Sequence, residues 1–163
     1  LRIERMEPQD IFDLIEVDVF AGSAYAPFYC LTVEFFEAAR ARLAPSGLLS
    51  MNVYAPGDDL TLAEAVVATL AKVFPTTFER QVEEERVLIA FREPTSLDAV
   101  RALLASPQLP GELQPVARAT AAALRASVLG GAVVLTDDRA PVEALTRRMI
   151  VRRDRLRAAL GPG

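Results

Sequence analysis

Two kinds of segment alternate along the first part of this 163-residue chain. Short runs rich in β-branched and aromatic residues are followed by longer segments in which apolar residues recur every three or four positions. The first pattern predicts strands and the second predicts amphipathic helices. Strands that alternate with helices of this length are joined by right-handed crossovers into a mostly parallel sheet. The pattern therefore predicts an α/β fold.

The first 92 residues predict the order strand, helix, strand, helix, strand, strand. The last two strands are separated only by three glutamates, so we expect an antiparallel hairpin that makes the sheet mixed. Thr32 or Leu31 begins the first helix, which Pro45-Ser46-Gly47 ends, and Asp58 or Asp59 begins the second. The expected strands cover residues 12–20, 48–54, 76–82 and 86–92.

The remainder of the chain reads mainly as helix. A short helix begins at Ser96 or Asp98, and a longer alanine-rich helix covers residues 112–129. Residues 133–135 are a candidate short strand, and Asp137 or Asp138 with Pro141 begins the last helix. No repeat or linker divides the chain. We therefore expect a single domain over 1–163, with a sheet part over 1–93 and a helical part over 94–163.

The composition excludes several classes of chemistry. The chain has no histidine and a single cysteine, Cys30, so a disulfide framework, a Cys/His zinc site and a Ser-His-Asp triad are excluded. A formal net charge of −4 argues against general nucleic-acid binding. No apolar run approaches the ~20 residues of a membrane span, and no signal-peptide pattern opens the chain. We expect a cytoplasmic protein that uses carboxylates, hydroxyls or backbone groups.

Candidate site residues follow the first expected strand, because ligands of open α/β sheets bind beyond the carboxyl ends of strands. The carboxylate of Asp18 can accept a proton from an amine or hold an ammonium group. Ser23 and Tyr25 can add hydrogen bonds, and Gly22 lets the backbone approach a ligand closely. The alternative is that Asp18 only caps backbone N–H groups of the following turn.

A second candidate stretch contains Asp137 and Asp138. A helix N-cap explains most of it, but two adjacent aspartates exceed what one cap needs, so one of them could face a cationic ligand. Glu16 indicates an exposed face of the sheet rather than a second catalytic acid. Cys30, next to Phe28 and Tyr29, is expected to be a small packed side chain.

Five stretches of the sequence together match one family. Residues 12–23 read FDLIEVDVFAGS, 31–36 read LTVEFF, 42–49 read RLAPSGLL, 52–54 read NVY and 136–143 read TDDRAPVE. This series resembles the C-terminal half of the spermidine synthase-like aminopropyltransferases, over about residues 12–92 and 132–145 of this chain. The resemblance implies a Rossmann-like, S-adenosylmethionine-dependent transferase fold, of which the expected elements are the second half.

The resemblance also implies a reaction and a departure from it. Family members pass an aminopropyl group from decarboxylated S-adenosylmethionine to an amine, and Asp18 matches their base or amine-holding aspartate. Ala21 stands where their second aspartate belongs, a loss of ~2 to 3 kcal/mol in polyamine binding, so we expect impaired activity. The family's glycine-rich cofactor loop and ribose-binding acid have no match before Asp13. The chain is therefore expected to be a fragment or a truncated homologue that cannot by itself bind the adenosyl cofactor.

Two other functions stay open. One is a methyltransferase that uses S-adenosylmethionine on the same fold, and the other is a non-catalytic truncated domain that serves in assembly. The expected small-molecule partner is an amine, with no nucleic acid and no membrane. The sheet edge beside residues 12–20 has only residues 1–6 to cover it, so we also expect a homo-oligomer.

Overall fold

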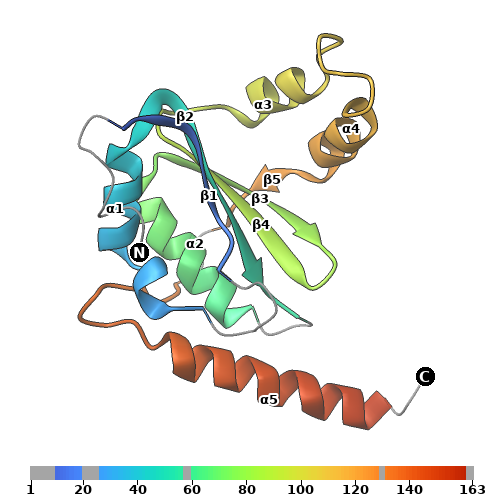
Figure 1. Cartoon of the computed structure of the whole chain (residues 1–163). Coiled ribbons are helices and arrows are strands. Elements are labelled where there is room, and N and C mark those ends of the chain that lie inside the picture. The colour runs from blue at the N-terminus through green and yellow to red at the C-terminus, as the bar shows by residue number, and fades with distance from the viewer. Residues whose placement is uncertain (1–9, 20–25, 57–59, 129–130, 161–163) are drawn as a thin grey trace.

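The computed structural model describes residues 10–19, 26–56, 60–128 and 131–160. A five-stranded sheet with strand order β1-β2-β4-β3-β5 lies at its centre (Figure 1). The strands are β1 (Phe12–Val17), β2 (Leu43–Tyr54), β3 (Thr76–Val82), β4 (Glu85–Phe91) and β5 (Arg125–Ala126). The helices are the 3-10 helix η2 (Phe28–Cys30), α1 (Val33–Ala41), α2 (Thr61–Val73), α3 (Leu97–Leu104), α4 (Gln114–Ala123) and α5 (Val142–Leu160).

The directions of the strands agree with the sequence prediction. β1 pairs with β2 in parallel, and β4 pairs in antiparallel fashion with both β2 and β3. β3 and β4 are joined by the acidic turn that was expected to form a hairpin. The mixed α/β sheet with an antiparallel hairpin is thus confirmed.

The entry into β2 differs from the prediction. Pro45-Ser46-Gly47 does not end the first helix, because α1 ends at Ala41 and these three residues lie inside β2. The β1–β2 register moves from Phe12↔Leu43 to Leu14↔Leu48, so residues 44–47 form a bulge. A β-carbon on Gly47 would lie 2.9 Å from the carbonyl oxygen of Ala44 and 3.0 Å from that of Phe12. Glycine is therefore required where the bulge meets β1.

The larger core lies between the sheet and the helices α1 and α2. β2 sends alternate side chains into it, since Leu49, Met51 and Val53 are fully buried. α2 adds Val66 and Leu70. This core covers one face of the sheet and sets the orientation of β1 and β2.

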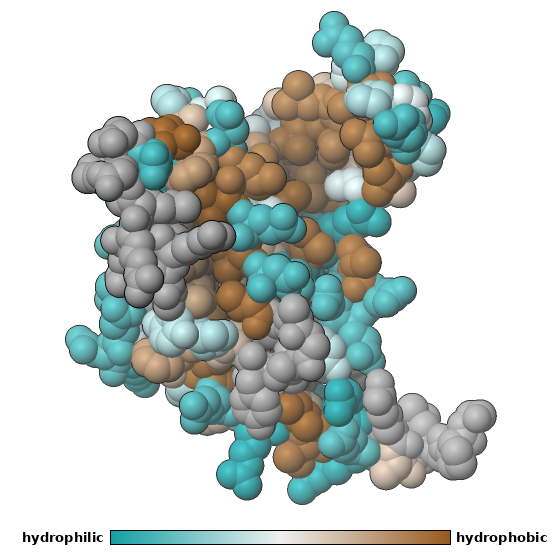
Figure 2. Space-filling model, in the orientation of Figure 1, coloured by the Kyte–Doolittle hydropathy of each residue, from teal (hydrophilic) through white to brown (hydrophobic). Residues whose placement is uncertain are grey.

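The other face of the sheet is covered only in part. α3 and α4 pack over β3 and β4 through a smaller cluster that contains Phe78, Val100 and Leu124. Near β1 this face is open, because Leu14 is 53% exposed and Glu16 is exposed, as the sequence predicted for Glu16. Figure 2 shows apolar residues on this side of the molecule, interrupted by hydrophilic ones.

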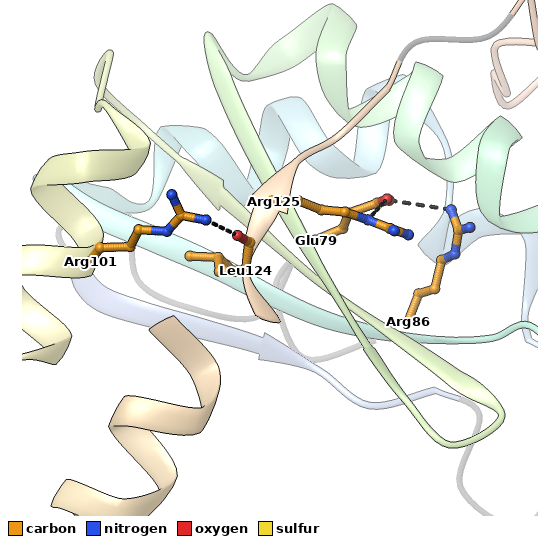
Figure 3. A network of polar contacts seen from close by, with 5 residues as sticks. All are labelled: Glu79, Arg86, Arg101, Leu124 and Arg125. Carbon is orange, nitrogen blue, oxygen red and sulfur yellow. Dashed lines mark hydrogen bonds and ion pairs between the residues drawn. The ribbon is translucent and has the colours of Figure 1, made fainter. Parts of the chain in front are cut away.

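The long helix expected over residues 112–129 is shorter than predicted. α4 ends at Ala123, and the chain turns into β5 because Leu124 is buried and Arg125 pairs with Glu79. Glu79 is only 4% exposed, and the guanidinium groups of Arg86 and Arg125 lie 3.3 and 2.8 Å from its carboxylate (Figure 3). Arg101 donates to the carbonyl of Leu124 at the end of α4 (2.9 Å).

Residues 133–135 do not form the expected strand. The backbone N–H of Leu135 donates to the hydroxyl of Thr69 (3.0 Å), and its carbonyl accepts from the N–H of Val33 (2.9 Å). In this segment Leu135 thus bonds to a side chain and to the start of α1 rather than to a strand.

The last helix begins later than predicted. Asp137 and Asp138 lie in a turn closed by backbone hydrogen bonds between Thr136 and Arg139, and α5 begins only at Val142. Among the helices that the structure describes, none is long and apolar enough to cross a membrane.

The bulge at Gly47 gives a stability prediction. We expect Gly47→Ala to lower the free energy of unfolding by ~1 to 3 kcal/mol, because the added methyl group would push against two backbone oxygens that cannot yield easily. Urea unfolding measures the change. Gly111→Ala is the matched control, since nothing lies within 4 Å of a β-carbon at that position. Equal effects of the two substitutions would contradict the close approach.

Candidate functional site

The carboxyl ends of β1 and β2 lie at the same edge of the sheet because the two strands are parallel. Val17 pairs with Met51 in the register, so Asp18 and Asn52 follow at neighbouring positions. Val17 and Met51 are buried on the helix-covered face. Asp18 and Asn52 are the next residues along, where side chains alternate to the open face. The structure thus places the sequence-predicted aspartate beside an amide.

Asn52 is a site residue to which the sequence analysis gave no role. Its Oδ1 atom is buried and has no hydrogen-bond partner among the described residues. An unsatisfied buried acceptor costs about 1 to 3 kcal/mol, so the position favours a ligand that brings an N–H or O–H donor. Asp18 is exposed and makes no hydrogen bond or ion pair to the described part of the chain. The carboxylate of Asp18 and the Oδ1 atom of Asn52 are both acceptors, and the Nδ2 group of Asn52 is a donor.

A polar relay lies where β2 ends. The hydroxyl of Tyr54 donates to Oε2 of Glu84 (3.0 Å) and accepts from Nη1 of Arg153 (2.7 Å). Hydrogen bonds from Arg153 to Asp154 and Tyr54 raise the pKa of this guanidinium further above its usual value. The relay fastens α5 to the end of β2. Sequence reasoning missed it, because an arginine in an arginine-rich helix gives no signal of a tertiary partner.

Asp137 has a structural partner at the start of α1. The hydroxyl of Thr32 donates to Oδ1 of Asp137 (2.7 Å) and accepts from the N–H of Phe35 (3.3 Å), which makes Thr32 the N-cap. The N–H of Asp137 donates to Oε2 of Glu34 (3.0 Å). Asp138 is exposed and has no partner among the described residues. Of the two aspartates, the geometry leaves Asp138 as the more available one for a cationic ligand.

Of the other predicted residues, some lie outside the described ranges and one is placed by the structure. Gly22, Ser23 and Tyr25, together with Ala21, lie outside the described residues. Cys30 is buried as expected, and burial raises the pKa of its thiol. In the described ranges no group of three or more acidic or cysteine side chains could hold a metal ion.

Solved structures resemble this arrangement of strands and helices. A probable spermidine synthase from Corynebacterium glutamicum ATCC 13032 matches with a TM-score of 0.53 and 23% identity, over 78% of this chain and 48% of that one. This likeness shows a Rossmann-like fold. Human methyltransferase-like protein 13, solved in complex with SAH, gives a TM-score of 0.48 at 20% identity, over 74% of this chain and 51% of that one.

The present chain therefore spans about half the length of either matching structure. No protein-family model matches the sequence. No curated protein matches it either.

The contact between Thr32 and Asp137 gives a second stability prediction. We expect Thr32→Val to lower the free energy of unfolding by ~1 to 2 kcal/mol, because it removes the N-cap and the bond to Asp137. Asp137→Ala should cost a similar amount, and the double variant less than the sum of the two. Asp138→Ala is the control and should change stability little. Additive effects of Thr32→Val and Asp137→Ala in thermal unfolding would contradict the contact.

Burial of Cys30 gives a prediction on reactivity. A thiol reagent attacks the thiolate, which burial disfavours and also shields. We expect the native chain to react with Ellman's reagent at pH 8 about a hundredfold more slowly than the chain unfolded in concentrated urea. Folding stability should fall as the pH rises above the thiol's unfolded-state pKa, because the folded chain keeps this proton longer. A native rate equal to the unfolded rate would contradict the burial.

Proposed function

We propose that this chain holds the amine in a reaction that transfers an aminopropyl group from decarboxylated S-adenosylmethionine to a small amine. The observation that carries the proposal is the pair formed by Asp18 and the buried, unpartnered Oδ1 of Asn52 at the carboxyl edge of β1 and β2. An amine has N–H donors to offer, and these two side chains present acceptors. The resemblance of residues 12–54 to aminopropyltransferases supports the same assignment.

In this proposal each of the two side chains has a distinct task. Oδ1 of Asn52 accepts a hydrogen bond from one N–H of the bound amine and so orients the lone pair of the amine nitrogen. Asp18 takes the other proton as the amine nitrogen forms its new bond to carbon, so that the product amine leaves without an added positive charge. The donor, when bound, supplies an aminopropyl carbon attached to a positively charged sulfur that leaves with the electron pair of the broken bond.

The described residues fit the amine better than they fit the adenosyl group. The exposed carboxylate of Asp18 and the unpartnered Oδ1 of Asn52 suit a ligand that is cationic or that has N–H or O–H donors. The glycine-rich loop and the ribose-binding acid that the resemblance leads one to look for have no match in this sequence. In this proposal the chain binds the amine, and none of its described residues is assigned to the adenosyl group.

Calorimetric titration tests the amine site. We expect 1,4-diaminobutane to bind weakly, in the millimolar range, and Asp18→Asn to weaken it about three- to tenfold, because a charge-assisted contact is lost. Asp13→Asn is the matched control: it removes an exposed acid at the other end of β1 and should leave affinity within about twofold. Equal losses in the two variants would refute a site at Asp18.

Restoring the family's second carboxylate tests the same site in the opposite direction. If Asp18 lies in the amine site, Ala21→Asp should strengthen diamine binding by about tenfold to a hundredfold.

Titrations with S-adenosylmethionine and with its decarboxylated form distinguish aminopropyl transfer from methyl transfer. Preference for decarboxylated S-adenosylmethionine supports aminopropyl transfer, and preference for S-adenosylmethionine itself favours a methyltransferase.

Binding of no amine and neither adenosyl compound would favour the assembly role. One observation speaks for that role as a second candidate: within the described ranges, β1 pairs only with β2, which leaves its outer edge without a strand. Sedimentation at low micromolar concentration measures whether two copies associate.

A further inference from the structure

A hollow with cationic walls lies at the opposite end of the sheet from Asp18. It has a volume of about 300 Å³ and sits at the C-terminal ends of α1 and α2. Its polar lining is three cations, Arg40, Lys72 and Arg92, and one carboxylate, Glu37, so the lining carries a net charge of about +2. We call it the cationic hollow.

The strand directions separate the cationic hollow from the amine site. Arg92 follows the end of β4, and its N–H donates to the carbonyl of Gly47 (3.0 Å) at the beginning of the regular part of β2. Because β4 runs antiparallel to β2, this point lies at the edge where β2 starts, whereas Asn52 lies near the edge where β2 ends. The cationic hollow is therefore not a part of the proposed amine site.

Two of the three cations are fixed by backbone oxygens rather than by carboxylates. Nη2 of Arg40 donates to the carbonyl of Arg92 (3.2 Å), and Nη1 of Arg92 donates to the carbonyl of Leu43. The ion pairs found among the described residues do not include these arginines or Lys72. Their positive charges are thus held in place without being neutralised.

Arg40, which lines the cationic hollow, has one donor without a partner. Nε of Arg40 is buried and has no hydrogen-bond partner among the described residues. Cations in the last turns of α1 and α2 are favourable next to the helix dipoles, which accounts for the presence of Arg40 and Lys72. That effect explains neither Arg92, which follows a strand, nor the orphaned Nε–H. Arg92 has its contact with the carbonyl of Leu43, and a bound acceptor would satisfy the Nε–H of Arg40.

We propose that the cationic hollow binds a phosphate group, either free phosphate or the phosphate of a small monoester. A dianion matches the net charge of the lining, and guanidinium groups suit phosphate oxygens because they present several N–H donors in one plane. The volume exceeds that of a phosphate ion, which leaves room for a short ester chain beside Val73 and Ala41. This inference is independent of the proposed amine function.

Titration calorimetry with sodium phosphate, and separately with glycerol 1-phosphate, at constant ionic strength tests the proposal. We expect both ligands to bind, with the monoester the tighter of the two if the ester chain occupies the rest of the hollow. Tighter binding of free phosphate would assign the site to the free ion. Absence of heat for both ligands, with no thermal stabilisation by either, would overturn the proposal.

Variants with opposite expected effects locate the site. Lys72→Gln removes an exposed cation and should weaken phosphate binding about three- to fivefold. Glu37→Gln removes the one carboxylate of the lining and should strengthen binding by a similar factor. Arg118→Gln is the control for net charge: Arg118 is exposed on α4, away from this hollow, and its loss should change affinity by less than about twofold. Effects in the same direction for Lys72→Gln and Glu37→Gln would refute the location.

The orphaned donor provides a readout that does not depend on charge. The Nε–H resonance of Arg40, assigned in a ¹H–¹⁵N spectrum by its loss in Arg40→Lys, should shift downfield when phosphate is added. A resonance that does not move at saturating phosphate would show that the anion binds elsewhere.

Discussion

β2 hydrogen-bonds to β1 on one side and to β4 on the other, so the positions of the other strands depend on it. Its parallel partner brings the carboxyl ends of β1 and β2 to one edge of the sheet. Its antiparallel partner brings the end of β4 to the opposite edge. As a result Asp18 and Asn52 lie at one edge and Arg92 at the other. The directions of the strands thus separate these two acceptor side chains from Arg92.

A buried backbone segment joins parts of the chain that are far apart in sequence. Leu135 is fully buried, so its N–H and carbonyl need partners, and it finds them in the hydroxyl of Thr69 and the N–H of Val33. This contact places the turn after Leu135 against Thr32, where Asp137 accepts its hydrogen bond. Residues 31–36 and 136–143, two of the stretches that carry the resemblance, therefore meet in the structure.

The parts of the fold that local sequence decides could be predicted. The parallel pair of β1 and β2 and the antiparallel pair of β3 and β4 were predicted from the alternation of patterns, and Thr32 was one of two residues expected to begin the first helix. The position of β4 between β2 and β3 was not predicted. The end of α4 could not be predicted, because burial of Leu124 and the pairing of Arg125 with Glu79 depend on a strand over 40 residues away. Residues 133–135 have strand-like composition, yet their hydrogen bonds go to a side chain and to the start of a helix rather than to a neighbouring strand.

The same distinction applies to the site. Asp18 could be located from sequence because a residue after a strand lies at the carboxyl edge wherever the sheet is parallel. Asn52 needed the structure, since its significance comes from a buried oxygen without a partner rather than from its residue type. The two ends of the sheet then differ in the proposals they support: Asp18 and Oδ1 of Asn52 are acceptors suited to the proposed amine, and the cationic hollow has donors suited to the proposed phosphate. A ligand suited to either end is disfavoured by charge at the other, so each site can be titrated without competition from its counterpart.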